Sequence, residues 1–231
     1  IAFIRDTGLS RLLMTIAVLV LAWSLSSIGY FWLQPLLSVD IGYNDAPVFY
    51  AIYYAIWAAL VFLVFRSSFG QGTKFDEPAA YALYFAAMAL CFAGFALLVL
   101  PRLPDTEWLR SETPVEFFWA NSWYFLPKSF EILFQQILIA ALILALNAMS
   151  LSLLRISVLV AALFGGFHLT LALSYPNPVY VLRYSVTATL FGAIVPDFIL
   201  RVRKGFFISY AVHWGFYAVD IVLIHFYFAA D

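Results

Sequence analysis

Long apolar runs, broken by short polar stretches, dominate the pattern of this chain. A helix that crosses the hydrocarbon core of a bilayer needs about 20 predominantly apolar residues. Seven runs predict such helices: Leu12–Leu37, Pro47–Phe65, Ala79–Leu100, Pro127–Met149, Leu153–Leu173, Val179–Leu200 and Phe206–Phe228. The runs are continuous and lack the polar–apolar alternation of membrane β-barrel strands. The predicted fold class is therefore all-α, a polytopic transmembrane helical bundle of about seven spans.

The polar stretches predict the connections between these spans. The longest, Pro101–Leu126, mixes aromatic with acidic side chains, a composition typical of the headgroup layer. We expect it to lie along the membrane interface. The chain shows no internal repeat and no linker, which predicts one integral membrane domain over residues 1–231. Within it, residues 12–100 form three N-terminal spans, 101–126 the interfacial segment and 127–231 the remaining core.

Composition narrows the class of protein. The sequence is 65% hydrophobic and 11% charged, whereas soluble domains are roughly a quarter charged. A water-soluble fold could not cover so much apolar side chain, so the lipid bilayer is the expected environment. No basic run is long enough to predict nucleic-acid binding. Cys91 is the only cysteine, which excludes disulfides within the chain and metal sites built from several cysteines.

The placement of lysine and arginine predicts the orientation in the membrane. If the N-terminus is inside, eight basic residues lie on the inner side: Arg5, Arg11, Arg66, Lys74, Arg155, Arg201, Arg203 and Lys204. Four lie on the outer side: Arg102, Arg110, Lys128 and Arg183. Because cytoplasmic loops carry the excess of positive charge, we expect a cytoplasmic N-terminus and a C-terminus on the opposite side.

Ionisable residues within the spans are candidates for a functional site, because they are costly in a bilayer. They are Glu131, His168, Asp197, His213, Asp220 and His225. Glu131 and Gln135 are four residues apart and share a helix face, and His213, Tyr217 and Asp220 share another. We expect Asp197 to form a local ion pair with Arg201. His225, near the end of its span, is better explained by a structural role.

Helix depth indicates which of these residues can meet. At about 1.5 Å per residue, Glu131, His168 and Asp220 lie within roughly 12 Å of the outer ends of their spans, and His213 lies roughly 22 Å deep. An acid and an imidazole at one level can activate a water, with or without a divalent metal held by Glu131 and His168. Each side chain alone is equally well explained by hydrogen bonds between helices. The sequence specifies no other cofactor.

Three motifs along the second half of the chain resemble those of a known family. The fourth span contains Phe130-Glu131-Ile132-Leu133-Phe134-Gln135, the fifth Phe164-Gly165-Gly166-Phe167-His168, and the seventh His213. Their order and spacing resemble the CAAX-prenyl-protease-related (CPBP, or ABI) intramembrane protease family. The resemblance covers roughly the last hundred residues and implies a CPBP-like core in the last four spans. It also implies hydrolysis of a peptide bond in the membrane, with Glu131 and His168 activating water and His213 or Asp220 in support.

The motifs also depart from the family pattern, which leaves two hypotheses. Phe130 stands where the family has its first glutamate, Gln135 where it has arginine, and Tyr217 where it has asparagine. One hypothesis is an endopeptidase that cleaves a prenylated or membrane-embedded peptide. The other is a catalytically inactive protein of the same fold, a scaffold or binding subunit of a complex with other membrane proteins.

Two further classes fit the sequence less well. A haem or pigment protein would use His168 and His213, whose depths differ. A transporter would show an inverted repeat, which the sequence lacks.

The absence of arginine at Gln135 also predicts the state of the acid. We expect no cation on the face of Glu131, so that its carboxyl is protonated and donates a hydrogen bond to His168. In that case Glu131→Gln would affect stability little.

Overall fold

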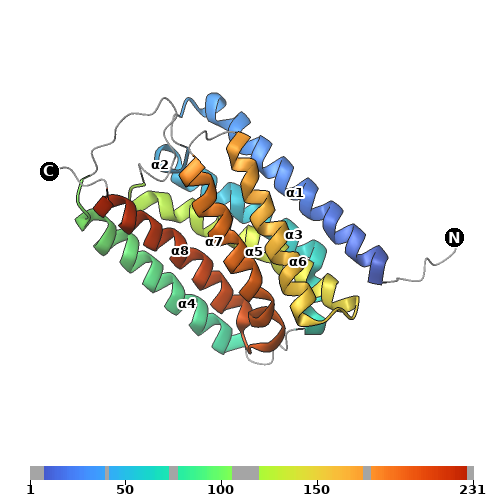
Figure 1. Cartoon of the computed structure of the whole chain (residues 1–231). Helices are drawn as coiled ribbons and strands as arrows, with labels where there is room; N and C mark the ends of the chain where they lie inside the picture. The colour runs from blue at the N-terminus through green and yellow to red at the C-terminus, as the bar shows by residue number, and fades with distance from the viewer. Residues whose placement is uncertain (1–7, 40–41, 73–77, 106–119, 174–177, 228–231) are drawn as a thin grey trace. The chain divides into compact units, whose positions relative to one another are not determined.

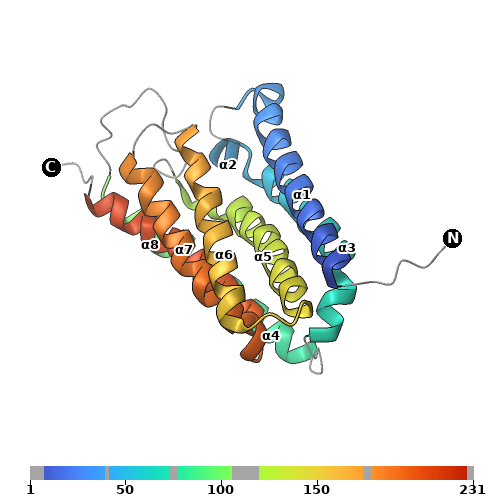
Figure 2. The same ribbon diagram turned by 45° about the vertical axis from the view of Figure 1, so that its right-hand side comes forward.

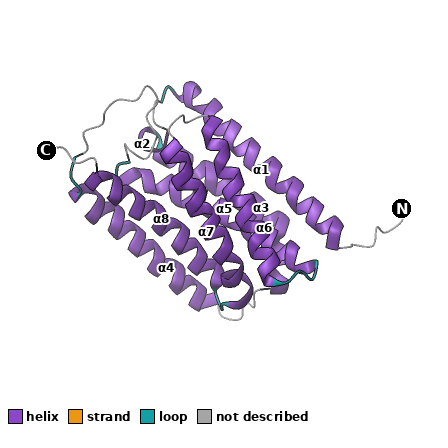
Figure 3. Cartoon of the chain, in the orientation of Figure 1, coloured by secondary structure: helices purple, strands orange, loops and turns teal. Residues whose placement is uncertain are grey.

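The computed structural model describes residues 8–39, 42–72, 78–105, 120–173 and 178–227. Almost all of these residues are helical, and they include no strand (Figure 3). The α-helices are α1 (Gly8–Leu37), α2 (Gly42–Asp45), α3 (Pro47–Gly72), α4 (Pro78–Gly94), α5 (Phe125–Ala148), α6 (Leu153–Leu169), α7 (Pro178–Arg201) and α8 (Gly205–Tyr227). Short segments extend three of them: the π-helix η1 (Phe95–Val99) and the 3₁₀ helices η2 (Leu100–Arg102), η4 (Ser122–Tyr124) and η5 (Thr170–Leu173).

The predicted spans agree with the helices. Within the described residues, seven helical segments are long and apolar enough to cross a bilayer: Gly8–Leu37, Pro47–Phe69, Ala82–Arg102, Ser122–Ala148, Leu153–Leu173, Pro178–Arg201 and Gly205–Tyr227. Their bounds lie within a few residues of the predicted ones. The all-α, membrane-spanning architecture is therefore confirmed.

Local chemistry accounts for several helix ends. Proline is the first residue of three helices, at Pro47, Pro78 and Pro178, where its missing N–H would have no helical partner anyway. The Ser152 hydroxyl accepts a hydrogen bond from the Arg155 N–H at 3.4 Å and caps the start of α6. Ser38 adopts a left-handed conformation with φ of 54° directly after α1. The backbone hydrogen bonds around it form a Schellman motif, which ends the helix.

The chain forms two compact units, each assembled from three separate stretches. Unit 1 comprises Ile1–Val20, Phe65–Thr73 and Leu138–Ser209. Unit 2 comprises Leu21–Val64, Lys74–Ile137 and Tyr210–Asp231. The boundary falls inside four helices, α1, α3, α5 and α8.

The helices α6 and α7 pack along each other in unit 1, as Figures 1 and 2 both show. Their contact depends on small residues: a Cβ added at Gly192 would meet the Ala161 Cα at 2.8 Å. One at Gly165 would meet the hydroxyl of Thr189. Around this contact lies a core of buried apolar side chains: Ile139, Leu142, Ile143, Leu146, Ile156, Val160, Phe191 and Val195. Small residues at the contact let the two backbones approach, which is how membrane helices gain van der Waals packing.

Aromatic side chains make up much of the core of unit 2. The buried ring of Tyr43 contacts four other buried tyrosines, Tyr30, Tyr50, Tyr54 and Tyr124, with centroids 5.3 to 5.9 Å away. The rings of Phe92 and Trp214 stack 3.9 Å apart and join α4 to α8, which run side by side in Figure 1. Such ring pairs stabilise beyond the area that they bury.

One sequence prediction falls largely outside the described residues. Residues 106–119 of the expected interfacial segment are among those not described, and so are Arg5, Lys74 and Arg110. The interfacial position of Pro101–Leu126 therefore stays a prediction. At its far end, within the described residues, Asn121 caps η4 by accepting hydrogen bonds from the Trp123 and Tyr124 N–H groups.

Candidate functional site

The candidate site is a polar cluster at the start of α5. This helix belongs to the most buried of the seven spans, Ser122–Ala148, in which 72% of the most apolar stretch of 18 residues is buried. Lys128, Glu131 and Gln135 are spaced three and four residues apart, so they lie on one helix face. The Lys128 ammonium donates to Glu131 Oε2 at 2.7 Å, and the Gln135 amide donates to Glu131 Oε1 at 2.8 Å. The shared face predicted for Glu131 and Gln135 is confirmed.

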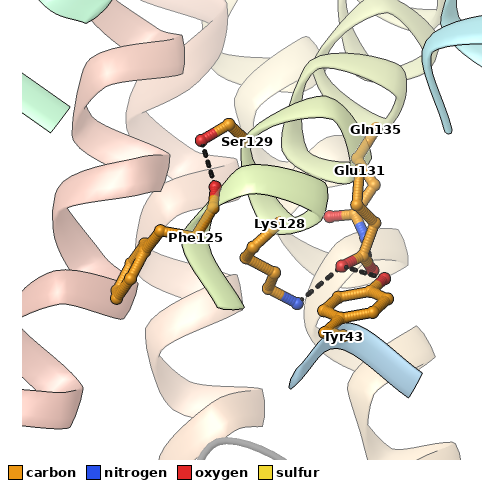
Figure 4. A network of polar contacts seen from close by, with 6 residues as sticks. All are labelled: Tyr43, Phe125, Lys128, Ser129, Glu131 and Gln135. Atoms are coloured by element: carbon orange, nitrogen blue, oxygen red, sulfur yellow. Dashed lines mark hydrogen bonds and ion pairs between the residues drawn. The ribbon is translucent and has the colours of Figure 1, made fainter. Parts of the chain in front are cut away.

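A fourth residue reaches the cluster from a distant part of the chain. Tyr43, on the short helix α2, donates its hydroxyl hydrogen to Glu131 Oε2 at 2.9 Å. Figure 4 shows the Tyr43 ring and the Lys128 ammonium both directed at the carboxylate. The side chains of Lys128 and Glu131 are only 10% and 16% exposed. Both oxygens of Glu131 therefore accept hydrogen bonds from protein donors in a largely buried setting.

The expectation that no cation shares the face of Glu131 is wrong. Lys128 lies one turn before the acid and forms the ion pair. The sequence carried the signal, because a lysine three residues before a glutamate in a helix is within reach of it. The family pattern directs attention to Gln135 as the place of the cation, whereas the cation is Lys128 on the other side of the acid. Tyr43 had no comparable signal, because it lies 88 residues from Glu131 in the chain.

The predicted stripe on α8 borders this cluster. His213, Tyr217 and Asp220 are all buried. The Lys128 ammonium lies 4.1 Å from the centroid of the Tyr217 ring, a cation–π contact. The His213 ring stacks on Tyr217 at 5.8 Å. Tyr217 therefore contacts both His213 and Lys128, the cation that pairs with Glu131.

A crossing of α8 over the start of α5 brings His213 closer than its depth predicts. The Trp214 indole N–H donates to the Ser129 hydroxyl at 2.9 Å, and the Tyr210 hydroxyl donates to the Ser129 carbonyl at 2.9 Å. Ser129 in turn donates to the Phe125 carbonyl on the face opposite the ion pair (Figure 4). Since His213 lies between Tyr210 and Trp214, counting residues from the end of the helix overestimates its separation from α5.

His168 belongs to unit 1, whereas Glu131 belongs to unit 2. In its own unit, the Nδ1 atom of His168 lies 2.8 Å from the Phe164 carbonyl one turn earlier. Its ring packs on Phe164 and Phe167. These contacts fit a structural role in α6, and a meeting of His168 with Glu131 stays a prediction.

The two remaining ionisable residues behave as the sequence indicates. Arg201 lies 3.3 Å from Asp197, and both side chains are well exposed, so the predicted local ion pair is confirmed. The Nδ1 atom of His225 lies 2.8 Å from the Pro104 carbonyl, which ties the end of α8 to the residues after η2. This contact agrees with the structural role expected for His225.

The donors around Glu131 leave little room for a metal. Two of its hydrogen bonds fall on Oε2 and one on Oε1, and one of the donors is itself a cation. A divalent ion would have to displace the Lys128 ammonium. No group of three His, Cys, Asp or Glu side chains suited to a metal occurs within the described ranges. The arrangement therefore fits a satisfied ion pair better than a metal centre.

Comparison with known proteins gives no relative: no family model, curated protein or solved structure matches the chain. The seven apolar helices identify the general class of protein to which the chain belongs. The protein is an integral, multi-pass membrane protein. Its resemblance to the CPBP family rests on the sequence motifs alone.

Proposed function

We propose that this protein is a catalytically inactive, CPBP-like membrane protein that serves as a scaffold or binding subunit of a larger membrane complex. The carrying observation is the state of Glu131, whose two oxygens accept hydrogen bonds from Lys128, Tyr43 and Gln135. A general base must reach the proton of a water directly. Here three protein donors, one of them a cation, already engage the carboxylate and compete with a water for it.

The motif departures support the same proposal. Gln135, at the position of the family's arginine, uses its amide to hold Glu131. Tyr217, at the position of its asparagine, covers the Lys128 ammonium with its ring. Both side chains are thus engaged in packing around the ion pair, so neither is available to stabilise an oxyanion. A largely buried ion pair held by further hydrogen bonds is suited to fixing the helices that it joins.

The peripheral helices support a binding role. In the spans Gly8–Leu37 and Ala82–Arg102, only 17% and 11% of the most apolar stretch of 18 residues is buried within this chain. These helices present apolar side chains to lipid or to helices of another membrane protein. Partner subunits would cover part of that surface.

The orientation is part of the proposal. The excess of lysine and arginine places the N-terminus in the cytoplasm. An odd number of spans then places the C-terminus on the opposite side.

The test is proteolysis by the purified protein in lipid nanodiscs. Wild type, Glu131→Gln and His168→Ala would each be incubated with a prenylated peptide and with a membrane-embedded peptide, and products followed by mass spectrometry. We expect no cleavage by any of the three. Robust cleavage by wild type that both substitutions abolish would establish the endopeptidase instead.

A second measurement addresses the scaffold role directly. In mild detergent, native electrophoresis of the protein from its own membranes should give a complex larger than the chain alone, with the same partners for wild type and His168→Ala. A protein that migrates only as a free chain would argue against a subunit role.

A further inference from the structure

The charges of unit 1 are strongly unbalanced. Its described residues include one acid, Asp197, against seven lysines and arginines. One of the seven, Arg183, lies within α7. The other six lie at or near helix ends and are called the basic rim: Arg11, Arg66, Arg155, Arg201, Arg203 and Lys204.

Contacts within unit 1 place the rim at one end of it. The α6–α7 pair is antiparallel, because Ala161 faces Gly192 whereas Gly165 faces Thr189 further back along α7. The first turn of α6, with Arg155, therefore lies beside the last turn of α7, with Arg201. Three side chains pack on one core cluster from the rim-bearing segments: Leu12, Leu151 and Ile199.

The other rim residues join this end through two more contacts. A Cβ on Gly8 would meet the Ala148 carbonyl, which places the start of α1 and Arg11 beside the end of α5. The rings of Phe69 and Phe206 lie 6.4 Å apart, which places the last turns of α3 and Arg66 beside the start of α8. Arg203 and Lys204 form the turn between α7 and α8, where Lys204 has a φ of 63°.

The rim is accessible and borders apolar surface. Arg66, Arg155, Arg201 and Arg203 are exposed. Leu154, next to Arg155, is 74% exposed, and Val202 between the two arginines of the turn is also exposed. Cations next to exposed apolar side chains at the ends of membrane helices match the border between phosphate groups and acyl chains.

We propose that the basic rim binds the phosphate groups of anionic phospholipids in the adjoining leaflet. Arginine presents a planar set of donors that pairs with two phosphate oxygens at once. Asp197, which pairs with Arg201, is the one acid among the described residues of unit 1. Basic clusters beside membrane helices attract anionic headgroups, with an effect that falls off within a Debye length.

Lipid binding at the basic rim is independent of the proposed function. It needs neither an inactive Glu131 nor a partner subunit. The orientation of the protein does not affect the measurement, because both leaflets of a nanodisc contain the same lipids and the rim meets anionic headgroups in either one.

The experiment measures lipid selectivity. The protein would be placed in nanodiscs of phosphatidylcholine with a minor fraction of phosphatidylglycerol, and the association of each spin-labelled lipid compared. We expect wild type to prefer phosphatidylglycerol. Arg201→Gln combined with Arg203→Gln should reduce that preference several-fold, on the order of fivefold, whereas the corresponding Arg→Lys pair should keep most of it.

A matched control separates the rim from a general charge effect. Arg203→Gln and Arg102→Gln each remove one exposed arginine near a helix end, but Arg102 lies in unit 2. Only Arg203→Gln should weaken the preference. Equal losses in both variants, or no loss in the double variant, would overturn the proposal.

Salt and phosphate decide the source of the ligand. Sodium chloride should reduce the preference, because exposed ion pairs are screened. Inorganic phosphate at the same ionic strength should reduce it no further. A clearly stronger effect of phosphate would assign the rim to a soluble anion and overturn the lipid proposal.

Discussion

At the scale of single residues, the ion pair of Lys128 and Glu131 is the most consequential feature of the protein. Taking two charges out of water is costly, and the cost is recovered only when both are close and fully hydrogen-bonded. Glu131 lies close to its counter-charge and accepts hydrogen bonds from three donors. The Lys128 ammonium lies between the carboxylate and the face of Tyr217. The pair thereby links α5 to α2 and α8.

This geometry reverses the expectation for Glu131→Gln. The substitution leaves the Lys128 ammonium largely buried without its counter-charge, a loss of about 3 kcal/mol. For a chain of this length, that corresponds to a melting temperature lower by about 6–12 °C. Thermal unfolding of the purified protein in detergent, followed by light scattering, would measure it.

Two variants serve as controls for that prediction. Asp197→Asn breaks an exposed ion pair and should change the melting temperature little. Lys128→Met combined with Glu131→Gln removes both charges and should lose less stability than Glu131→Gln alone. If Glu131→Gln melts like wild type, the pair does not stabilise the fold, and the earlier expectation of little effect is correct.

At the scale of elements, the packing of α6 against α7 depends on where glycine occurs. The two helices carry glycines with different surroundings. Gly192 lies against the α6 backbone at Ala161, whereas an added Cβ at Gly166 would meet nothing within 4 Å. The sequence indicates that glycines in a membrane helix permit close approach, but it does not say which of two adjacent glycines is used. The packed neighbour is Gly165.

A pair of substitutions tests this packing. Gly192→Ala would place a methyl group 2.8 Å from the Ala161 Cα, and backbone atoms on both sides must then move apart. We expect destabilisation of about 1–3 kcal/mol, measured as a lower melting temperature. Gly166→Ala should be neutral or stabilising by up to about 1 kcal/mol, because alanine favours helix. Similar effects of both substitutions would show that helix propensity, not contact, sets the result.

At the scale of the whole molecule, seven spans and an uneven distribution of positive charge lead to a testable topology. Connections that follow α5 and α7 should lie on the cytoplasmic side, and the connection before α5 on the other. In a Cys91→Ser background, single cysteines at Ser152 and Arg203 should resist an impermeant maleimide added outside intact cells. A cysteine at Asn121 should react. If the cysteines introduced at Ser152 and at Asn121 are labelled from the same side of the membrane, the seven-span topology is contradicted.

The sequence alone determined the helices and the helix faces. Span length is a local property, because each segment must satisfy its own backbone hydrogen bonds in lipid, and the predicted runs therefore match α1 and α3 to α8 closely. The stripe of His213 and Asp220 and the pairing of Glu131 with Gln135 follow from helical periodicity, which is also local.

Only the tertiary structure decided which faces meet. Tyr43 reaches Glu131 across 88 residues of sequence, and Tyr217 covers Lys128 because α8 crosses the start of α5. Gly192 lies against Ala161 because two antiparallel helices share small residues at one level. The physical reason is the same in each case. Helix propensity and hydrophobicity act along the chain, whereas the partner of a buried polar group is chosen by packing between segments that the sequence separates.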